Sequence, residues 1–276
     1  MKQERGIIFR IFAVLVTAIF ALPLYLAVVN VFKTLEQIRY HPIALPAPFT
    51  WDNILTVLNR PDKLLFEGLK YSLLITTTTV ILLVFFSSTI GFYIGRKDNR
   101  WTRVLLFLFV AGLLIPPQVT LIPVTRLLKF LGLMGSFQGL VLYLSGGGLL
   151  SFAVFVYAGF VKTIPKELDE SAIIDGANQF TLFWRIIFPL MRPATATVVI
   201  YLSLWTWNEF LLPLIIVGPS RGITITTGIY TAVGTYTSDY GQIFSLMLLS
   251  AIPMLIFFFA LQKEFIAGLT AGSLKG

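Results

Sequence analysis

Six long apolar runs, separated by polar connections, constrain this chain more than any other feature of its sequence. A helix needs about 20 predominantly apolar residues to cross the hydrocarbon core of a bilayer. Because lipid offers no hydrogen-bond partners, the backbone groups of such runs must pair within their own segments, which favours helices. The sequence predicts a single-domain, all-α integral membrane protein with six transmembrane helices, at Ile7–Phe32, Tyr71–Gly95, Val104–Val124, Phe137–Val161, Ala194–Val217 and Ile243–Leu261.

Composition supports a lipid environment and argues against nucleic acid as a partner. Hydrophobic residues make up 57% of the chain and charged residues only 12%, against about a quarter charged in soluble domains. The net charge of +8 comes from short cationic runs beside apolar segments, and not from a basic face interleaved with aromatic residues. There is no cysteine, and the one histidine, His41, has no second ligand near it. We expect His41 to be a loop residue and expect no metal site.

The distribution of lysine and arginine predicts the orientation in the membrane. Thirteen of these residues fall on the side of the N-terminus and eight on the other side. The short connection Arg96–Arg103 alone carries four cations, and short cytoplasmic loops are enriched in them. The first apolar run is too long for a signal peptide and is expected to be retained. We therefore expect a protein of the cell membrane with both termini in the cytoplasm and with the loops Lys33–Lys70 and Gly218–Gln242 outside.

A polar island, Lys162–Pro193, lies between the fourth and fifth runs on the predicted cytoplasmic side. Pro165 suits the first turn of a helix. Gly176 then allows a corner, and a second short helix is expected over Asn178–Phe188, ended by Pro189. Negative charge is favoured at a helix N-terminus, and the first helix opens with Glu167, Asp169 and Glu170.

The spacing within this island resembles the EAA motif of ABC-importer membrane subunits, E-A-A-x3-G-x9-I-x-L-P. Here the motif reads Glu170-Ser171-Ala172, then Gly176 after three residues, then Ile186-Ile187-Phe188-Pro189 after nine more. Ser171 stands in place of the first alanine and Phe188 in place of the leucine, and both substitutions keep a small or an apolar side chain. Further segments are similar to the shorter, six-helix permease subunit of maltose-type carbohydrate importers, at 23–34, 48–55, 114–123, 131–142, 207–210 and 268–276.

This resemblance implies a type I importer architecture in which the island carries a coupling helix that docks on a cytoplasmic ATPase. It implies that Glu170 and Ser171 belong to the contact, that Ala172 is a close-packing position and that Gly176 is the corner, with Asp175 as a weaker candidate. The partners implied are a second homologous permease subunit, two copies of the ATPase and an extracytoplasmic solute-binding protein. The alternative is an amphipathic helix lying on the bilayer surface, but its acidic start disfavours the anionic leaflet.

The chain itself lacks the phosphate-binding signature G-x-x-x-x-G-K-[ST], so ATP would be bound by the partner and this chain would hold no cofactor. We find no base–nucleophile pair, carboxylate dyad or metal-ligand spacing, and we expect a transport subunit and not an enzyme. The absence of an ATPase signature also fits an ion-coupled secondary transporter, although that class favours paired intramembrane charges and an internal repeat. An importer of a non-sugar solute, such as a sugar phosphate, is a further alternative.

A second group of candidates, Trp205, Trp207, Asn208 and Glu209, lies in the outer half of the fifth run. An intramembrane glutamate usually faces a cavity or a partner helix. Glu209 and Asn208 are therefore equally compatible with a translocation path and with hydrogen bonds that hold helices together. Trp205 and Trp207 could stack on sugar rings, but an interfacial aromatic belt is favoured. Gly146–Gly148 is expected to allow close helix packing, and Pro116–Pro117 to bend or end the third run.

Overall fold

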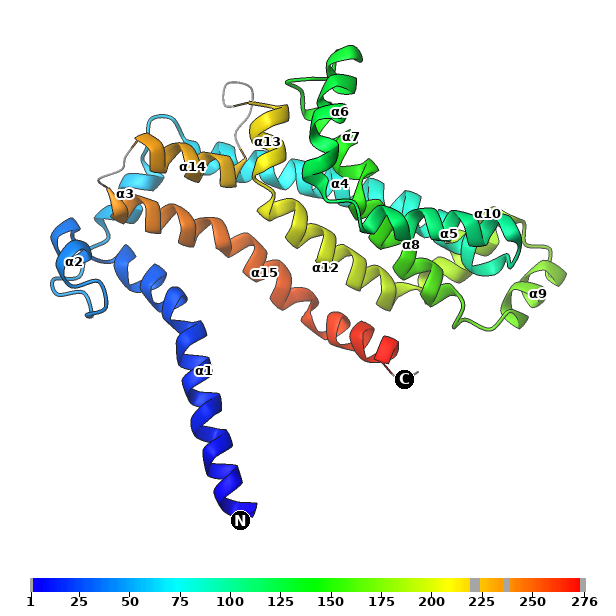
Figure 1. Ribbon diagram of the computed structural model, residues 1–276, viewed down its shortest axis with the longest axis horizontal. Coiled ribbons are helices and arrows are strands. Elements are labelled where there is room, and N and C mark those ends of the chain that lie inside the picture. The colour runs from blue at the N-terminus through cyan, green and yellow to red at the C-terminus, as the bar shows by residue number, and fades with distance from the viewer. Residues whose placement is uncertain (1, 219–223, 236–238, 274–276) are drawn as a thin grey trace.

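The computed structural model describes residues 2–218, 224–235 and 239–273, and every regular element within them is helical. This confirms the predicted all-α class. The longer helices form an elongated bundle, from which the first helix, α1 (Lys2–Val31), departs at a steep angle (Figure 1). The bundle is built from α4 (Leu64–Arg96), α5 (Arg100–Leu113), α8 (Gly148–Val161), α12 (Arg192–Asn208) and α15 (Tyr240–Ser273).

The centre of the bundle is the contact between α4 and α8, and two glycines allow it. A Cβ atom added to Gly91 would lie 2.5 Å from the Cβ atom of Tyr157, and one added to Gly95 would lie 2.9 Å from the side chain of Val161. Glycines four residues apart let two membrane helices approach closely, because they leave a groove in one helix surface. The pair Gly91 and Gly95 therefore sets the distance between α4 and α8.

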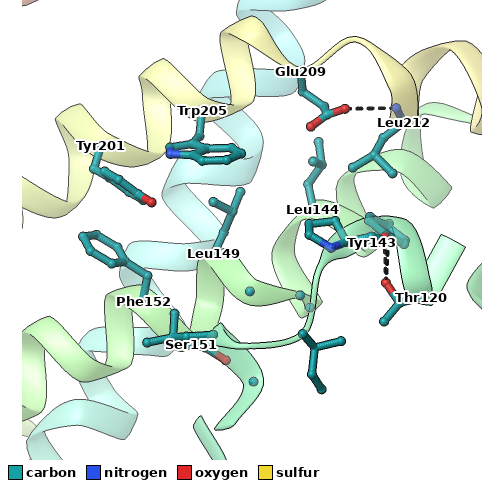
Figure 2. A pocket seen from close by; sticks show the side chains of 17 residues that line it. Thr120, Tyr143, Leu144, Leu149, Ser151, Phe152, Tyr201, Trp205, Glu209 and Leu212 are labelled. Carbon is teal, nitrogen blue, oxygen red and sulfur yellow. Dashed lines mark hydrogen bonds between the residues drawn. The ribbon is translucent and has the colours of Figure 1, made fainter. Parts of the chain in front are cut away.

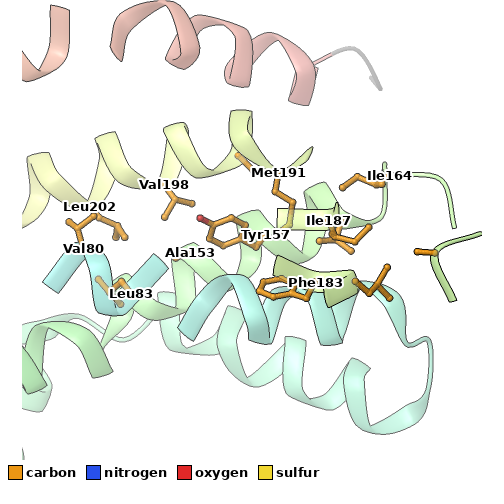
Figure 3. Close-up of a cluster of buried hydrophobic side chains, with 14 residues drawn as sticks. Val80, Leu83, Ala153, Tyr157, Ile164, Phe183, Ile187, Met191, Val198 and Leu202 are labelled. Carbon is orange, nitrogen blue, oxygen red and sulfur yellow. The ribbon is translucent and has the colours of Figure 1, made fainter. Parts of the chain in front are cut away.

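The largest hydrophobic cluster lies at the end of the bundle that carries the polar island (Figure 3). Tyr157 of α8 is fully buried in it, and its hydroxyl donates a hydrogen bond of 3.1 Å to Oγ1 of Thr195 in α12. The island contributes directly to this cluster through Ala172, Leu182, Phe183 and Ile187. The island is thus anchored to the bundle by the same packing that joins the spans.

Three helices are long and apolar enough to cross a membrane unaided: Phe12–Val31 within α1, all of α4, and Tyr240–Gln262 within α15. Counting each bent helix pair as one span raises the number in the described residues to as many as six. The predicted first, second and sixth spans correspond to these straight helices. α4 begins at Leu64, seven residues before the predicted start at Tyr71.

The third run is bent at Pro116–Pro117, as expected, and the fourth run, predicted as one helix, is broken as well. The third run folds as α5 and α6 (Pro117–Phe130), bent by 102°, and the fourth as α7 (Phe137–Gly146) and α8, bent by 43°. Pro116 holds an extended backbone, with φ −61° and ψ 134°, and Pro117 starts the next helix, as proline geometry favours. A Cβ atom added to Gly146 would meet nothing within 4 Å. The glycine run breaks the helix here, and only Gly148 lies close to another helix, since its added Cβ atom would be 3.9 Å from the carbonyl oxygen of Gly112.

The fifth run is interrupted as well. α12 ends at Asn208, Glu209 takes an extended conformation, and α13 (Leu211–Ile216) follows as a separate short helix. At its other end, α12 is bent by 75° from the helical segment Gln179–Leu190. A run predicted as one span is therefore two helices in the structure, with Glu209 at the break.

The segments predicted as outer loops contain short helices, namely α2 (Leu35–Tyr40), α3 (Asp52–Leu58) and α14 (Ile225–Thr235). Lys33 is buried beside α2, where its Nζ atom donates to the carbonyl oxygens of His41 and Pro42 at 2.9 and 2.8 Å. His41 follows α2 at its C-terminal cap and is exposed. Of the predicted loop Gly218–Gln242, residues 219–223 and 236–238 lie outside the described part of the chain.

Candidate coupling surface and translocation cavity

The first helix of the polar island is α9 (Glu167–Ile174), and its corner is the predicted one. Three acidic residues occupy its first turn, where the helix dipole favours them. Pro165 lies just before the helix and not in its first turn. Gly176 adopts φ +86°, and the backbone N–H groups of Gly176 and Ala177 donate to Ile173 and Ala172 at 3.0 and 2.9 Å. These two bonds form a Schellman motif, in which a left-handed glycine ends a helix.

The second helix of the island begins as predicted but ends later. Asn178 caps it, because its Oδ1 atom accepts from the backbone N–H of Thr181 at 2.8 Å. The expectation that Pro189 stops the helix at Phe188 is wrong. The turn before Pro189 is a π-helix, in which the N–H group of Phe188 donates to the carbonyl oxygen of Phe183, five residues back. This wider turn makes room for the proline ring and does not need the N–H group that proline lacks. The helical path continues through α10 (Gln179–Thr181), η1 (Leu182–Ile187) and α11 (Phe188–Leu190).

The residues of the EAA-like motif divide between an exposed face and the core of the chain. Glu170, Ser171, Asp175 and Gly176 are exposed. Ala172 is only 6% exposed and packs in the hydrophobic cluster with η1, so the close packing predicted at this position is with the chain's own helix. The exposed face also carries large apolar side chains that sequence reasoning missed, although apolar residues within a polar island are a readable signal: Leu168, Ile173, Ile174 and Phe180.

An ion pair connects the island to the bundle. Nη2 of Arg96, at the end of α4, donates to Oδ1 of Asp169 in α9 at 2.8 Å, and the two side chains are only 10% and 16% exposed. Nη1 of the same guanidinium donates to the carbonyl oxygens of Val161 and Ile164 at 3.1 and 2.7 Å, so it also caps the C-terminus of α8. Arg96 and Asp169 are 73 residues apart, and no spacing rule reveals this pair in the sequence.

A cavity of about 370 Å³ opens where the helix breaks meet (Figure 2). One wall is aromatic: the rings of Phe152 and Tyr201 are stacked with centroids 3.9 Å apart, and Trp205 continues the row. Glu209 contributes the carboxylate in this lining, and hydroxyl groups come from Thr120, Tyr143 and Ser151. The cavity is thus mostly apolar with a few polar groups, as small-molecule sites usually are.

The polar groups of the cavity are held in place by the broken helices. The carboxylate of Glu209 accepts from the backbone N–H of Leu212 at 3.1 Å and so caps α13. The Tyr143 hydroxyl donates to the carbonyl oxygen of Pro117 at 3.0 Å and lies 2.9 Å from Oγ1 of Thr120. Interruptions of transmembrane helices are tolerated where they line a cavity and where their free backbone groups find new hydrogen-bond partners. The breaks and the cavity are therefore one feature.

The structure brings together only two of the four predicted path residues. Trp205 and Glu209 both line the cavity. Asn208 is exposed outside its lining, and its Nδ2 atom donates to the Leu204 carbonyl oxygen at 2.8 Å. Trp207 is 5% exposed and belongs to a separate hydrophobic cluster, so it does not line this cavity. Two residues along a helix correspond to a rotation of about 200°, so Trp205 and Trp207 cannot share a face.

Comparison with known proteins places this geometry in a family. Residues 87–269 match the model of the binding-protein-dependent transport system inner membrane component. The multiple sugar-binding transport system permease protein MsmG of Streptococcus mutans is 32% identical over the full length of both chains. The starch degradation products permease AmyC of Thermoanaerobacterium thermosulfurigenes is 31% identical, covering 92% of this chain and 91% of its own.

A solved structure supports the same fold. A chain of a bacterial ABC transporter involved in the import of the acidic polysaccharide alginate superposes with a TM-score of 0.85 at 18% identity, covering 95% of this chain and 97% of its own. The family match spans α8, the polar island and the cavity residues on α12. The predicted resemblance is confirmed: the chain belongs to the binding-protein-dependent transport system inner membrane components and is a multi-pass permease subunit of an ABC transporter.

Proposed function

We propose that this permease subunit moves a sugar or an oligosaccharide into the cytoplasm, driven by ATP hydrolysis on a separate ATPase. The names of its relatives support a carbohydrate substrate, since they include permeases for multiple sugars, for starch degradation products and for melibiose, raffinose and stachyose. These names favour a sugar importer over the two alternatives, an importer of a sugar phosphate and an ion-coupled secondary transporter.

The observation that carries this proposal is the combination of aromatic and acidic groups in the cavity between the helix breaks. Tyr201 and Trp205 offer flat apolar faces to the C–H groups of a sugar ring. Glu209, Ser151 and Thr120 offer hydrogen-bond acceptors and donors to its hydroxyl groups. A carboxylate makes the stronger of these bonds because it is charged. The cavity therefore suits a neutral, polyhydroxylated substrate.

The coupling assignment rests on the exposed face of α9 and of the turn that follows it. Ile174 is 84% exposed, one turn of α9 after Glu170, and Ile173 on α9 and Phe180 on α10 are exposed as well. Large apolar side chains surrounded by polar residues mark an interaction site. The ATPase is the occupant proposed for this surface, with two copies serving this chain and a homologous second permease. ATP is bound and hydrolysed by that partner, so this chain is not itself an enzyme and needs no cofactor.

The membrane orientation follows from the cation-rich connection Arg96–Arg103. It carries four cations in eight residues, and short loops of this kind stay in the cytoplasm. The segment 162–193 and both termini then lie in the cytoplasm of the cell. The helices α2, α3 and α14 face outward, where a solute-binding protein delivers the sugar.

Substitutions in the cavity test the proposed path. Glu209→Gln keeps an oxygen that can cap α13 but removes the charge offered to the sugar. A hydrogen bond to a charged group contributes about 1.5–3 kcal/mol, so half-maximal uptake should need roughly ten times more sugar or beyond. Trp205→Ala should also weaken uptake, whereas Asn208→Ala, outside the cavity lining, is the matched control and should match the wild type.

The measurement is uptake by proteoliposomes that contain the purified complex, with maltotriose, raffinose and arabinotriose as probes and glucose 6-phosphate as the comparison. If all three variants transport a sugar as the wild type does, the cavity does not lie on the path. If glucose 6-phosphate alone is taken up, the carbohydrate assignment is wrong while the importer assignment survives.

A further inference from the structure

A second cavity, of about 280 Å³, lies beside the junction of α4 and α5 and shares no lining residue with the first one. Ile94 and Leu106 form an apolar part of its wall. The rest is strongly basic, because a single acid, Asp98, faces five cations: Arg96, Lys97, Arg103, Lys162 and Lys166. Residues from two distant parts of the sequence thus converge on one site.

The carboxylate of Asp98 does not balance this charge. It pairs with Nε of Arg103 at 2.9 Å, and both side chains are largely exposed. The hydrogen bond from Arg103 lowers the pKa of Asp98, and Lys162 and Lys166 lower it further, so both lysines lie within electrostatic reach of the cavity. Lys97 has its Nζ atom 4.7 Å from the centre of the Tyr93 ring. Among the described ion pairs of this region, none neutralises Lys97, Lys162 or Lys166.

Arg96 supplies an independent indication of a missing acceptor. Its side chain is nine-tenths buried, and its two terminal nitrogens are taken by Asp169 and by two carbonyl oxygens. Its Nε–H group is buried without a hydrogen-bond partner among the described residues. A buried donor of a charged group is costly to leave unpaired. The same side chain lines the basic cavity, so the unpaired donor belongs to a residue of the cavity wall.

The surroundings of the cavity indicate which anion fits. Trp101, Phe107 and Leu108 are exposed on α5 next to it, in the pattern of a helix that leaves the membrane through its interface. Basic pockets between membrane helices on the cytoplasmic side suit the headgroups of anionic lipids. A phosphate group offers several acceptors to lysine and arginine donors. An acyl chain could then lie along the exposed apolar face of α5.

We propose that this cavity binds a phosphate group, carried by an anionic phospholipid of the cytoplasmic leaflet. The leaflet rests on the proposed orientation, whereas the phosphate site rests on the cavity alone. A lipid bound here would contact the end of α4 and the entry to the polar island at once. The occupied site would therefore hold together the elements that position α9.

The test measures lipid binding to the delipidated complex by native mass spectrometry, with phosphatidylglycerol, phosphatidylcholine and inorganic phosphate as separate probes. The cavity variant carries Lys97→Gln, Lys162→Gln and Lys166→Gln. Loss of three cations near a membrane surface predicts a fall in phosphatidylglycerol affinity of about 100-fold. The control variant removes the same charge from exposed positions outside the cavity, through Arg100→Gln, Arg126→Gln and Lys129→Gln, and should bind as the wild type does.

A third variant, with arginine at positions 97, 162 and 166, should retain binding and so shows that charge, and not folding, is responsible. Equal binding of phosphatidylcholine, or equal losses in the glutamine variants, would overturn the site. Displacement of the lipid by inorganic phosphate that itself binds with the same variant dependence would keep the phosphate site and overturn the lipid. None of these results depends on sugar uptake, so the proposed transport function is tested separately.

Discussion

Glu209 connects the local structure of this permease to its proposed chemistry. Its backbone leaves the helical conformation at the end of α12, and its carboxylate caps α13. The same carboxylate lines the larger cavity (Figure 2). The backbone carbonyl of Glu209 accepts from Oγ1 of Thr226 at 2.9 Å, which ties the break to α14. One residue therefore ends a helix, starts another and places an acid where a substrate can meet it.

Gly176 gives a prediction about the corner of the polar island. Its φ of +86° is a left-handed conformation that costs most residues about 1–2 kcal/mol, although a Cβ atom would meet nothing there. Gly176→Ala should lower the melting temperature of the complex and reduce sugar-stimulated ATP hydrolysis. Gly176→Asn is the matched variant, because asparagine tolerates this conformation. Equal behaviour of the two variants would mean that backbone strain at this corner is irrelevant.

At this scale, the sequence indicates residue types more reliably than the faces on which they lie. Glu209 could be predicted as a cavity residue, because an ionisable side chain within an apolar run is costly and usually faces a cavity or a partner helix. The spacing of Trp205 and Trp207 shows that they lie on different faces of a helix, but the sequence does not show which of the two residues faces the cavity. Tyr201 and Trp205 are four residues apart and share a face of α12. Tyr201 could therefore be predicted to line the cavity only once Trp205 was known to line it.

At the scale of helices, the positions of the apolar runs could be predicted, but their continuity could not. Hydropathy measures the tendency to leave water and does not register a bend. Pro116 and Pro117 marked a break in the third run, whereas Glu209 and Phe210 carry no comparable breaking signal. Close packing of Gly91 and Gly95 against α8 depends on a contact between distant segments, which a single sequence does not contain.

The Arg96–Asp169 pair predicts how motion of α9 reaches the bundle. Asp169→Asn removes the charge that receives the Arg96 guanidinium, and hydrogen bonds of charged groups contribute about 1.5–3 kcal/mol. We expect the complex to assemble and to hydrolyse ATP at its basal rate, with a several-fold loss of the stimulation by sugar and binding protein. Glu67→Gln, at an exposed acid near the opposite end of α4, is the control. The connection would be refuted if both variants kept full stimulation.

At the scale of the molecule, this chain is built to be one part of an assembly. α1 lies mostly outside the bundle (Figure 1), and it exposes Phe9, Phe12, Ile19, Phe20 and Leu24 by more than 60% each. Only its end contacts α15 and the outer helices. Lipid alone can cover such a helix. A second permease subunit is the partner that we propose for this chain.

The most direct measurement of the central claim is sugar uptake by proteoliposomes that contain the tagged chain with the proteins that copurify with it. The account predicts that a sugar accumulates in the lumen only when ATP is present there, on the cytoplasmic side of the complex, and the binding protein is present outside. It also predicts that Glu170→Lys abolishes this uptake while the chain stays in the membrane. Uptake by the isolated chain, driven by an imposed proton or sodium gradient without ATP, would contradict the account.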